Sequence, residues 1–191
     1  MSFPTYVDPI PLPAPVTTGS TIQSYTDPLG DLWVAKNGVR SGNWYRAREV
    51  LRGRIYRAAA LTPPTNWQTI VLDGTAYDPF GIMGVGTTVH LTVPVAGYWE
   101  FRAQCNWTAS GRAICTLWKN ATGAAAGGNE MDRGFDVTPG GTNPPMNGAT
   151  GCTELLVVGD TVAMQIYNTT SFALSVGAAF TFFQATWVAN P

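Results

Sequence analysis

From residue 67 onward, the hydrophobic pattern is that of short β-strands. β-Branched and aromatic residues form short runs, and Gly, Pro and Asn separate these runs. In the clearest run, every second residue from Trp99 to Trp107 is apolar and the residues between them are polar, which is typical of a strand with one buried face. The strands expected from this pattern are 68–72, 87–93, 97–107, 112–119, 154–158, 161–168 and 172–187, the last of them divided in two.

The turns between these runs favour an antiparallel arrangement. Turns are expected at 73–74, 94, 110–111 and 159–160, where Gly, Pro, Asp or Ser interrupts the apolar pattern. Two Gly- and Pro-rich stretches, 121–129 and 138–151, are expected to be loops. About seven or eight strands joined in this way predict an all-β fold, an antiparallel jelly-roll sandwich.

The first third of the chain has a different organisation. Five prolines within residues 1–15 predict an extended arm over residues 1–30. The alternation in 31–36 and the Asn-Gly pair after it predict a β-hairpin that returns through 39–47, with a short helix over 45–51 as an alternative to its last part. We therefore expect an arm (1–30), an attachment segment (31–60), a linker (61–66) and a jelly-roll knob (67–191).

Positive charge is concentrated in the segment that precedes the sandwich. Only 12% of the 191 residues are charged and the net charge is −1, yet residues 36–60 hold seven of the eleven Lys and Arg side chains. Because the Arg guanidinium binds carboxylates through two hydrogen bonds and stacks on aromatic rings, this segment is expected to dock on an acidic protein surface. The expected anchor residues are Trp33, Arg40, Trp44, Arg46, Arg48, Arg52, Arg54 and Arg57.

The basic segment has two alternative interpretations. Arginines beside aromatic rings can bind nucleic acid, but the rest of the chain is acidic and would repel phosphate. A solvated or self-paired face is the second alternative. We expect no nucleic-acid partner.

Few residues in the chain offer catalytic or metal-binding chemistry. His90 is the only histidine, and the alternation around it places it on the polar face of its strand, in a surface or interface role. No nucleophile motif accompanies it, so the chain is not expected to be an enzyme. The acidic stretch 130–136 is expected to be a solvated loop, with a structural calcium site as the alternative, and no cofactor is expected.

The cysteines and the apolar runs indicate how the chain is made. Cys105, Cys115 and Cys152 lack metal-ligand spacing and are expected to be reduced thiols, although Cys105 and Cys115 could face each other across a hairpin and form a disulfide. No run of 18 apolar residues predicts a membrane span, and the start of the chain does not have the pattern of a signal peptide. Synthesis in a cytoplasm without membrane insertion is therefore expected.

Four motifs follow one another in the second part of the chain: Tyr-Asp-Pro before a strand, Gly-x-Trp-x-Phe, Lys-Asn-Ala and Gly-Asp-x-Val. In this order they resemble the motifs of the globular heads of complement C1q and of the tumour necrosis factor (TNF) superfamily, which have Gly-x-Tyr-x-Phe and Lys-Asn-Gly at the second and third places. The resemblance covers about 125 residues and implies a homotrimeric jelly roll without a collagen-like stalk. It assigns structural roles to Tyr77, Asp78, Pro79, Gly97, Trp99, Phe101, Asn120, Gly159, Asp160 and Val162.

The attachment segment contains Asp-Leu-Trp-Val-Ala-Lys-Asn-Gly-Val at residues 31–39 and Trp-x-Arg-Ala-Arg at residues 44–48. With these sequences, and with the Pro-rich stretch before them, it resembles structural proteins of tailed bacteriophages. The resemblance implies a virion surface protein, a trimeric knob attached through its N-terminal part to major capsid proteins as a decoration protein or to tail proteins as a minor tail protein. The alternative is a host-surface adhesin or receptor-binding module that recognises a glycan or a protein.

Overall fold

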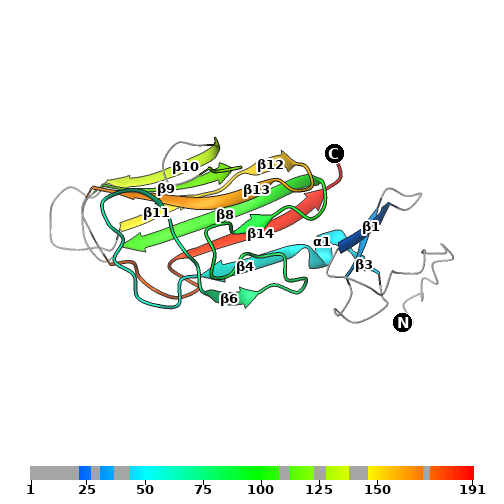
Figure 1. Cartoon of the computed structure of the whole chain (residues 1–191), viewed down its shortest axis with the longest axis horizontal. Helices are drawn as coiled ribbons and strands as arrows, with labels where there is room; N and C mark the ends of the chain where they lie inside the picture. Colours follow the sequence, from blue (N-terminus) through cyan, green and yellow to red (C-terminus); the bar gives the residue numbers. More distant parts are fainter. Residues whose placement is uncertain are drawn as a thin grey trace, which may run out of the picture.

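Two antiparallel β-sheets lie face to face, and a third, small sheet stands at one end of them, in the computed structural model of the chain (Figure 1). The structure describes residues 22–26, 31–36, 44–107, 112–122, 128–137, 146–169 and 173–191. The expected turn at 110–111, most of the two expected loops and residues 37–43 lie outside the described residues.

The first large sheet has six strands. Its order is β11-β8-β14-β4-β6, and β12 also pairs with β8. The strands are β4 (Arg52–Tyr56), β6 (Gly74–Tyr77), β8 (Gly97–Trp107), β11 (Met146–Thr150), β12 (Thr153–Leu156) and β14 (Phe182–Ala189). All pairings are antiparallel, and the longest strand, β8, pairs with β11, β12 and β14.

The second large sheet has five strands. Its order is β10-β9-β13-β5, and β7 pairs with the start of β13. The strands are β5 (Asn66–Thr69), β7 (Leu91–Thr92), β9 (Arg112–Lys119), β10 (Asn129–Val137) and β13 (Thr161–Asn168). A β-bulge between Glu130 and Asp132 interrupts the pairing of β10 with β9.

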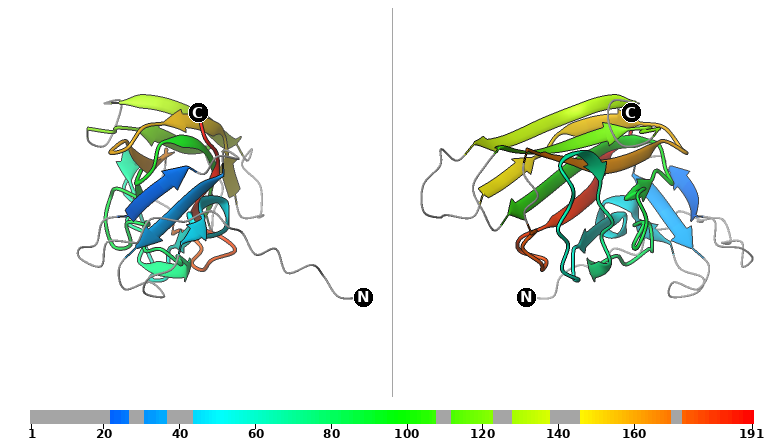
Figure 2. Two further views of the ribbon diagram at one scale, coloured as in Figure 1. Left: turned by 90° about the vertical axis from the view of Figure 1, so that its right-hand side faces the viewer. Right: turned by 60° about the vertical axis from the view of Figure 1, so that its left-hand side comes forward.

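The small sheet is joined to the sandwich by a shared core. It consists of β1 (Ile22–Thr26), β2 (Leu32–Lys36) and β3 (Tyr45–Arg46), and the short helix α1 (Ala47–Val50) leads from β3 toward β4. Leu32, Val34 and Leu51 are buried in the same apolar cluster as the sandwich core, and the Trp187 N–H donates to the Leu51 carbonyl at 2.9 Å. Figure 2 shows the small sheet across the end of the sandwich, beside the C-terminal end of β14.

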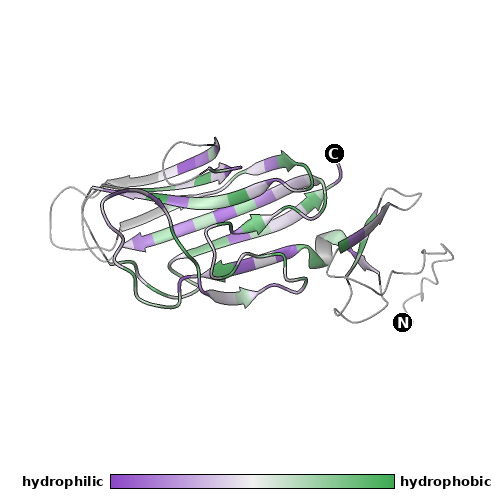
Figure 3. Cartoon of the chain, in the orientation of Figure 1, coloured by the Kyte–Doolittle hydropathy of each residue, from purple (hydrophilic) through white to green (hydrophobic). Residues whose placement is uncertain are grey.

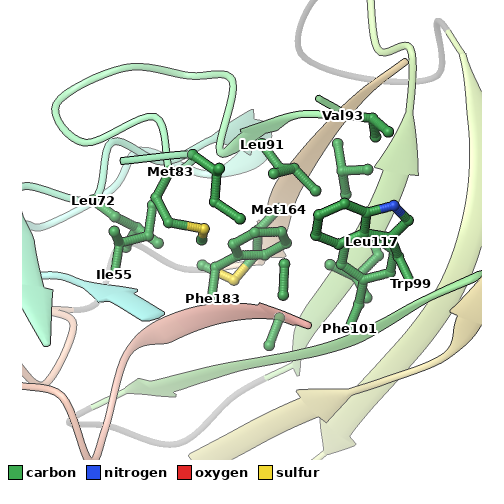
Figure 4. Close-up of a cluster of buried hydrophobic side chains, with 14 of the residues drawn as sticks. Ile55, Leu72, Met83, Leu91, Val93, Trp99, Phe101, Leu117, Met164 and Phe183 are labelled. Atoms are coloured by element: carbon green, nitrogen blue, oxygen red, sulfur yellow. The ribbon is translucent and has the colours of Figure 1, made fainter. Parts of the chain in front are cut away.

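Aromatic side chains fill the space between the two large sheets. Trp99 and Phe101 on β8 and Phe183 on β14 are fully buried, with 5.9 Å between the ring centroids of Phe101 and Phe183 (Figure 4). Leu117 on β9 and Met164 on β13 meet them from the opposite sheet. The alternation of hydrophilic and hydrophobic positions along β8 in Figure 3 is the sequence pattern that produces this one-sided burial.

Strands that carry a regular pattern were predicted with correct bounds. The expected strands 97–107, 112–119 and 161–168 coincide with β8, β9 and β13. In β8 apolar and polar residues alternate, so the period of two is visible in the sequence, whereas β9 and β13 are mostly apolar runs that are buried on both sides over most of their length. The antiparallel jelly-roll prediction is confirmed by the pairing of these strands.

The sandwich begins earlier in the chain than residue 67. Residues 52–56, placed in the attachment segment, form β4 between β14 and β6, because Gly53 and Ile55 face the core while the charged residues between them face outward. Residues 61–66, expected to be a linker, also belong to the sandwich: the Leu174 N–H donates to the Leu61 carbonyl at 2.8 Å, and Pro63 is buried.

Three segments expected to be irregular contain strands. The acidic stretch 130–136 lies in β10, and residues 146–150 of the second expected loop form β11. Residues 22–26 of the expected arm form β1, which pairs with β2. Gly and charged residues conceal the period of two in β10 and β11. These two strands take their conformation from hydrogen bonds to the longer strands β9 and β8.

Replacing Phe183 with Ala should lower the free energy of unfolding by about 3–5 kcal/mol, since the deletion leaves a cavity between the sheets. The matched control is Gln184→Ala on the outward side of the same strand, which should change stability by less than about 1 kcal/mol. Urea unfolding followed by fluorescence measures both. Equal effects of the two substitutions would contradict the core described above.

Candidate functional site

Two of the sequence motifs meet in one hydrogen-bonded cluster at an end of the sandwich. The Asn120 side-chain amide donates to Asp160 Oδ1 at 2.9 Å, and its oxygen accepts the Thr161 N–H at 2.8 Å. Lys119 Nζ lies 2.8 Å from Asp160 Oδ2, which also accepts the Val157 N–H at 2.9 Å. These bonds tie the end of β9 to the turn before β13, and both carboxylate oxygens already have partners, so the residues hold the fold.

The carboxyl group of Asp160 remains ionised in this cluster. Burial raises its pKa, but hydrogen bonds from Lys119, Asn120 and the Val157 N–H lower it by more, and the net pKa is below the ordinary value. The preceding Gly159 has a φ of 91°, in the region that favours glycine. Glycine thus forms the turn, and the aspartate fastens it.

The other motif residues also shape the fold. A Cβ on Gly97 would lie 2.4 Å from the Ala189 carbonyl oxygen, so the start of β8 can approach β14 only with glycine there. Asp78 accepts the Ile82 N–H at 2.9 Å and the Met83 N–H at 3.0 Å and so fixes the turn after β6. The remaining residues divide by burial: Trp99, Phe101 and Val162 are in the core, whereas Tyr77 and Pro79 are exposed.

His90 is buried in the core, contrary to the surface or interface role expected of it. Its Nδ1 accepts the Met164 N–H at 2.9 Å, so its Nε2 carries the proton and donates to the Ile70 carbonyl at 3.0 Å. Its ring also lies against Phe183, with 5.3 Å between the centroids. The short β7 begins only at Leu91, so the alternation assumed for 87–93 does not apply to His90.

The anchor residues of the small sheet lie close together on its surface. Arg46 pairs with Asp31 at 3.5 Å, and its guanidinium lies 5.5 Å from the centre of the Trp33 ring. Trp44 meets Tyr25 edge to face, at 6.4 Å between the centroids. Arg40 and the side chain of Arg48 lie outside the described residues.

Arg52 and Arg54 form a second group, on the outer face of the six-stranded sheet. Arg52 lies over the exposed Tyr77 ring at 6.0 Å, and Arg54 lies 3.7 Å from the centre of the Phe182 ring and donates to the Ala178 carbonyl. Within the described part of the chain, neither forms an ion pair with a carboxylate. Both can therefore meet an acidic partner without breaking an existing pair.

Arg57 does not belong to this surface. Its guanidinium donates to the carbonyls of Val71 at 3.0 Å and Ala59 at 2.8 Å, and it pairs with Asp73 at 3.4 Å. These contacts use the guanidinium inside the chain, so the structure assigns Arg57 to holding the end of β4 rather than to a partner.

The outer face of the six-stranded sheet exposes large apolar side chains that the sequence analysis did not single out. Leu155 on β12 is the cross-strand neighbour of Tyr98 on β8, and their side chains are 43% and 41% exposed. Val157 and Val158, which follow β12, and Val188 on β14 are also exposed. Tyr98 and Leu155 alternate with inward-facing core residues in the sequence, which is the one signal that could have identified them.

The three cysteines are free thiols. Cys105 and Cys115 are buried on β8 and β9, which belong to different sheets, so they meet across the core and not across a hairpin. Burial and the neighbouring Cys115 raise the pKa of the Cys105 thiol well above its ordinary value, which keeps it protonated and unreactive.

Where the structure describes the chain, no group of three His, Cys, Asp or Glu side chains is close enough to hold a metal ion. None of the helices found there has the length and apolar character needed to cross a membrane.

Solved structures of C1q and TNF domains have this arrangement of sheets. The globular domain of zebrafish complement 1qA protein matches with a TM-score of 0.54 and 13% identity, over 73% of this chain and 98% of that one. Murine APRIL matches with a TM-score of 0.56 and 9% identity, over 72% and 98%. The Eiger TNF of S. frugiperda matches with a TM-score of 0.53 and 13% identity, over 73% and 93%.

These likenesses concern the fold. The chain is an antiparallel jelly roll of the kind found in C1q and TNF domains. No family model matches its sequence, and neither does any curated protein.

The stability of the protein should fall by about 3 kcal/mol as the pH drops from 6.5 to 4, because of His90. Burial lowers the pKa of His90 from 6.5 to about 4, so over this window the unfolded chain binds a proton that the folded chain does not. A proton on Nδ1 would also face the Met164 N–H.

Denaturant titrations at several pH values test this loss against the variant His90→Gln, which keeps a donor but does not titrate. The variant should show a much flatter dependence between pH 6.5 and 5, where Asp73, Asp132 and Asp160, whose pKa values are lowered, are ionised in both states; below pH 5 the unfolded chain begins to protonate these carboxylates in both proteins alike. The same slope in both proteins would show that His90 is not the group responsible.

Proposed function

We propose that this chain is a homotrimeric structural knob of a tailed-bacteriophage virion, attached to the capsid or tail by its N-terminal part. The observation that carries the trimer is the exposed apolar side chains on the outer face of the six-stranded sheet. The phage placement rests on the sequence resemblance of residues 31–48.

Self-association is supported by the fold and by this face. C1q and TNF domains form homotrimers, as the sequence resemblance implied, and the present chain has their jelly roll. Large exposed side chains such as Tyr98 and Leu155 lose unfavourable contact with water when a second copy covers them. Polar residues lie beside them, including the exposed pair of Arg102 and Glu100 at 2.9 Å, as in interfaces with an apolar centre and a polar rim.

Attachment is supported by the position of the cationic groups. The small sheet, in which the Arg46 guanidinium lies over the Trp33 ring, stands at one end of the sandwich. Arg52 and Arg54 lie on the outer face of the six-stranded sheet, and neither forms an ion pair with a carboxylate of the described residues. Unpaired guanidinium groups beside aromatic rings suit a carboxylate-rich protein partner. In this proposal the partner is a major capsid or tail protein at the virion surface.

The variant Leu155→Asp should convert the trimer to monomers at micromolar concentration, because a charge at the centre of an apolar interface loses its hydration. Val89→Asp is the matched control, since Val89 is 36% exposed beside the other large sheet. Multi-angle light scattering should give three times the mass of the chain for the wild type and the control. A monomeric wild type, or a trimeric Leu155→Asp variant, would refute the interface.

Virion attachment should depend on the unpaired arginines. Antibody against the full chain should label phage particles in electron micrographs, on the head for a decoration protein and on the tail for a minor tail protein. The double variant Arg52→Ser, Arg54→Ser should still form trimers but should lose most of this label. The control variant is Arg102→Ser, which removes an exposed arginine that is already paired with Glu100 and should keep the label. Lys119 does not serve as a control, because its ion pair with Asp160 holds the fold. Absence of label from every particle would reject the phage placement.

A further inference from the structure

An aromatic pair lies on the outer face of the five-stranded sheet, where neither the trimer nor the attachment uses it. Trp67 on β5 and Tyr167 on β13 are direct cross-strand partners. Their ring centroids are 5.2 Å apart and the ring planes are inclined by 44°. Both side chains are only partly buried, so together they form an apolar surface open to solvent.

The charges next to this aromatic pair neutralise each other. The Arg133 guanidinium lies 5.4 Å from the centre of the Trp67 ring, and it forms two hydrogen bonds with the Glu130 carboxylate. Arg133 therefore covers one side of Trp67 with its positive charge already paired. The site offers an aromatic surface without a free charge on these residues.

A separate groove lies further along the same strands. Thr69 lies two residues beyond Trp67 on the same side of β5, and it lines a depression of about 210 Å³. The groove presents hydroxyl, amide and small apolar groups from Gln68, Thr69, Thr88, Val89, Thr161 and Ala163, and no ionisable side chain lines it. Residues 161–167 of β13 span roughly 20 Å, so a ligand that touches both the groove and the aromatic pair must be extended and must cross the covered residues between them.

The part of the sheet between the groove and the aromatic pair is held rigid by hydrogen bonds. Thr116 and Gln165 are fully buried there, and the Thr116 hydroxyl donates to the Gln165 carbonyl at 3.2 Å. The Trp118 indole N–H donates to the same hydroxyl at 2.8 Å. A surface fixed in this way loses little conformational entropy when a ligand binds.

We propose that this face binds a neutral carbohydrate chain. Sugar rings present an apolar face of C–H groups and a rim of hydroxyls, and the site offers matching partners: two aromatic rings, then the threonine hydroxyls and the Gln68 amide. An anionic ligand would need an unpaired cation, whereas Arg133 is paired with Glu130. A peptide added along β5, the edge strand of the sheet, would bond to the backbone and would not require the rings.

This inference goes beyond the structural role proposed above, and its test does not depend on that role. Full-length protein is applied to an array of neutral and acidic bacterial-surface oligosaccharides. We expect binding to neutral oligosaccharides, a loss of affinity of at least tenfold in Trp67→Ala, and a loss of severalfold in Thr69→Val, which keeps the shape of the side chain and removes the hydroxyl. Light scattering on each protein reports the trimer separately.

The matched control is Tyr77→Ala, which removes an exposed aromatic ring from the six-stranded sheet and should leave binding unchanged within twofold. If Trp67→Ala fails to fold by circular dichroism, Trp67→Phe and Thr69→Val decide, since the first should retain binding and the second should weaken it. Wild type that binds no neutral oligosaccharide, or only acidic ones, would overturn the proposal. Equal binding by wild type and both site variants would overturn it as well.

Discussion

The packing of Phe101 against Phe183 between the two sheets determines which side chains are left for interactions with other molecules. In a β-strand, fixing one residue inward fixes its neighbours outward, and a slip of one residue would reverse every position. With Phe101 buried on β8 and Phe183 buried on β14, Tyr98 and Arg102 must face out. Phe182 follows the same rule and supports Arg54 from the outer side. The surface chemistry of the six-stranded sheet is thus a consequence of its core.

Buried polar groups impose a second constraint, on how the loops cross the sandwich. His90 joins the Ile70 carbonyl to the Met164 N–H, and so connects a loop segment to the centre of β13. Asp160 and Asn120 do the same for the turns at the end of β9 and the start of β13. Each group is satisfied by partners far away in the sequence, so these bonds specify one arrangement of loops and not merely a compact core. Their dependence on protonation makes this arrangement sensitive to acid.

The sequence predicted the parts of the fold that depend on local pattern. β8 shows the alternation of a strand with one buried face, and β9 and β13 are mostly apolar runs bounded by turn residues. β10 and β11 show neither pattern, because Gly134 and Gly148 interrupt them; a Cβ on Gly134 would clash with the Ala149 carbonyl, a contact between strands that no local rule reveals. The strand formed by residues 52–56 was not predicted, for a related reason. Three arginines dominate the local composition up to Arg57, whereas only Gly53 and Ile55 face the core.

The candidate sites were less predictable than the fold, since they depend on which residues meet across strands. Clustering of basic residues in the sequence joined Arg57 to Arg52 and Arg54, although hydrogen bonds direct Arg57 inward. The aromatic pair of Trp67 and Tyr167 is separated by 100 residues and exists only because β5 pairs with β13. The burial of His90 could likewise not be predicted, because the sequence does not show that β7 is only two residues long and begins after His90.

The two outer faces of the sandwich have different chemistry, and this difference permits both proposals to hold in one molecule. If other copies cover the apolar residues on β8, β12 and β14 and leave Arg52 and Arg54 free on β4, toward the other edge of the sheet, the five-stranded sheet on the opposite side faces away from the trimer axis. Each trimer then presents three identical grooves on its exterior. A shallow groove without charged contacts binds a single carbohydrate chain weakly, but three grooves that engage a polymer surface together gain strength through their high effective concentration. Many trimers on one particle would extend this gain, so weak recognition by each subunit is compatible with firm attachment of the whole assembly.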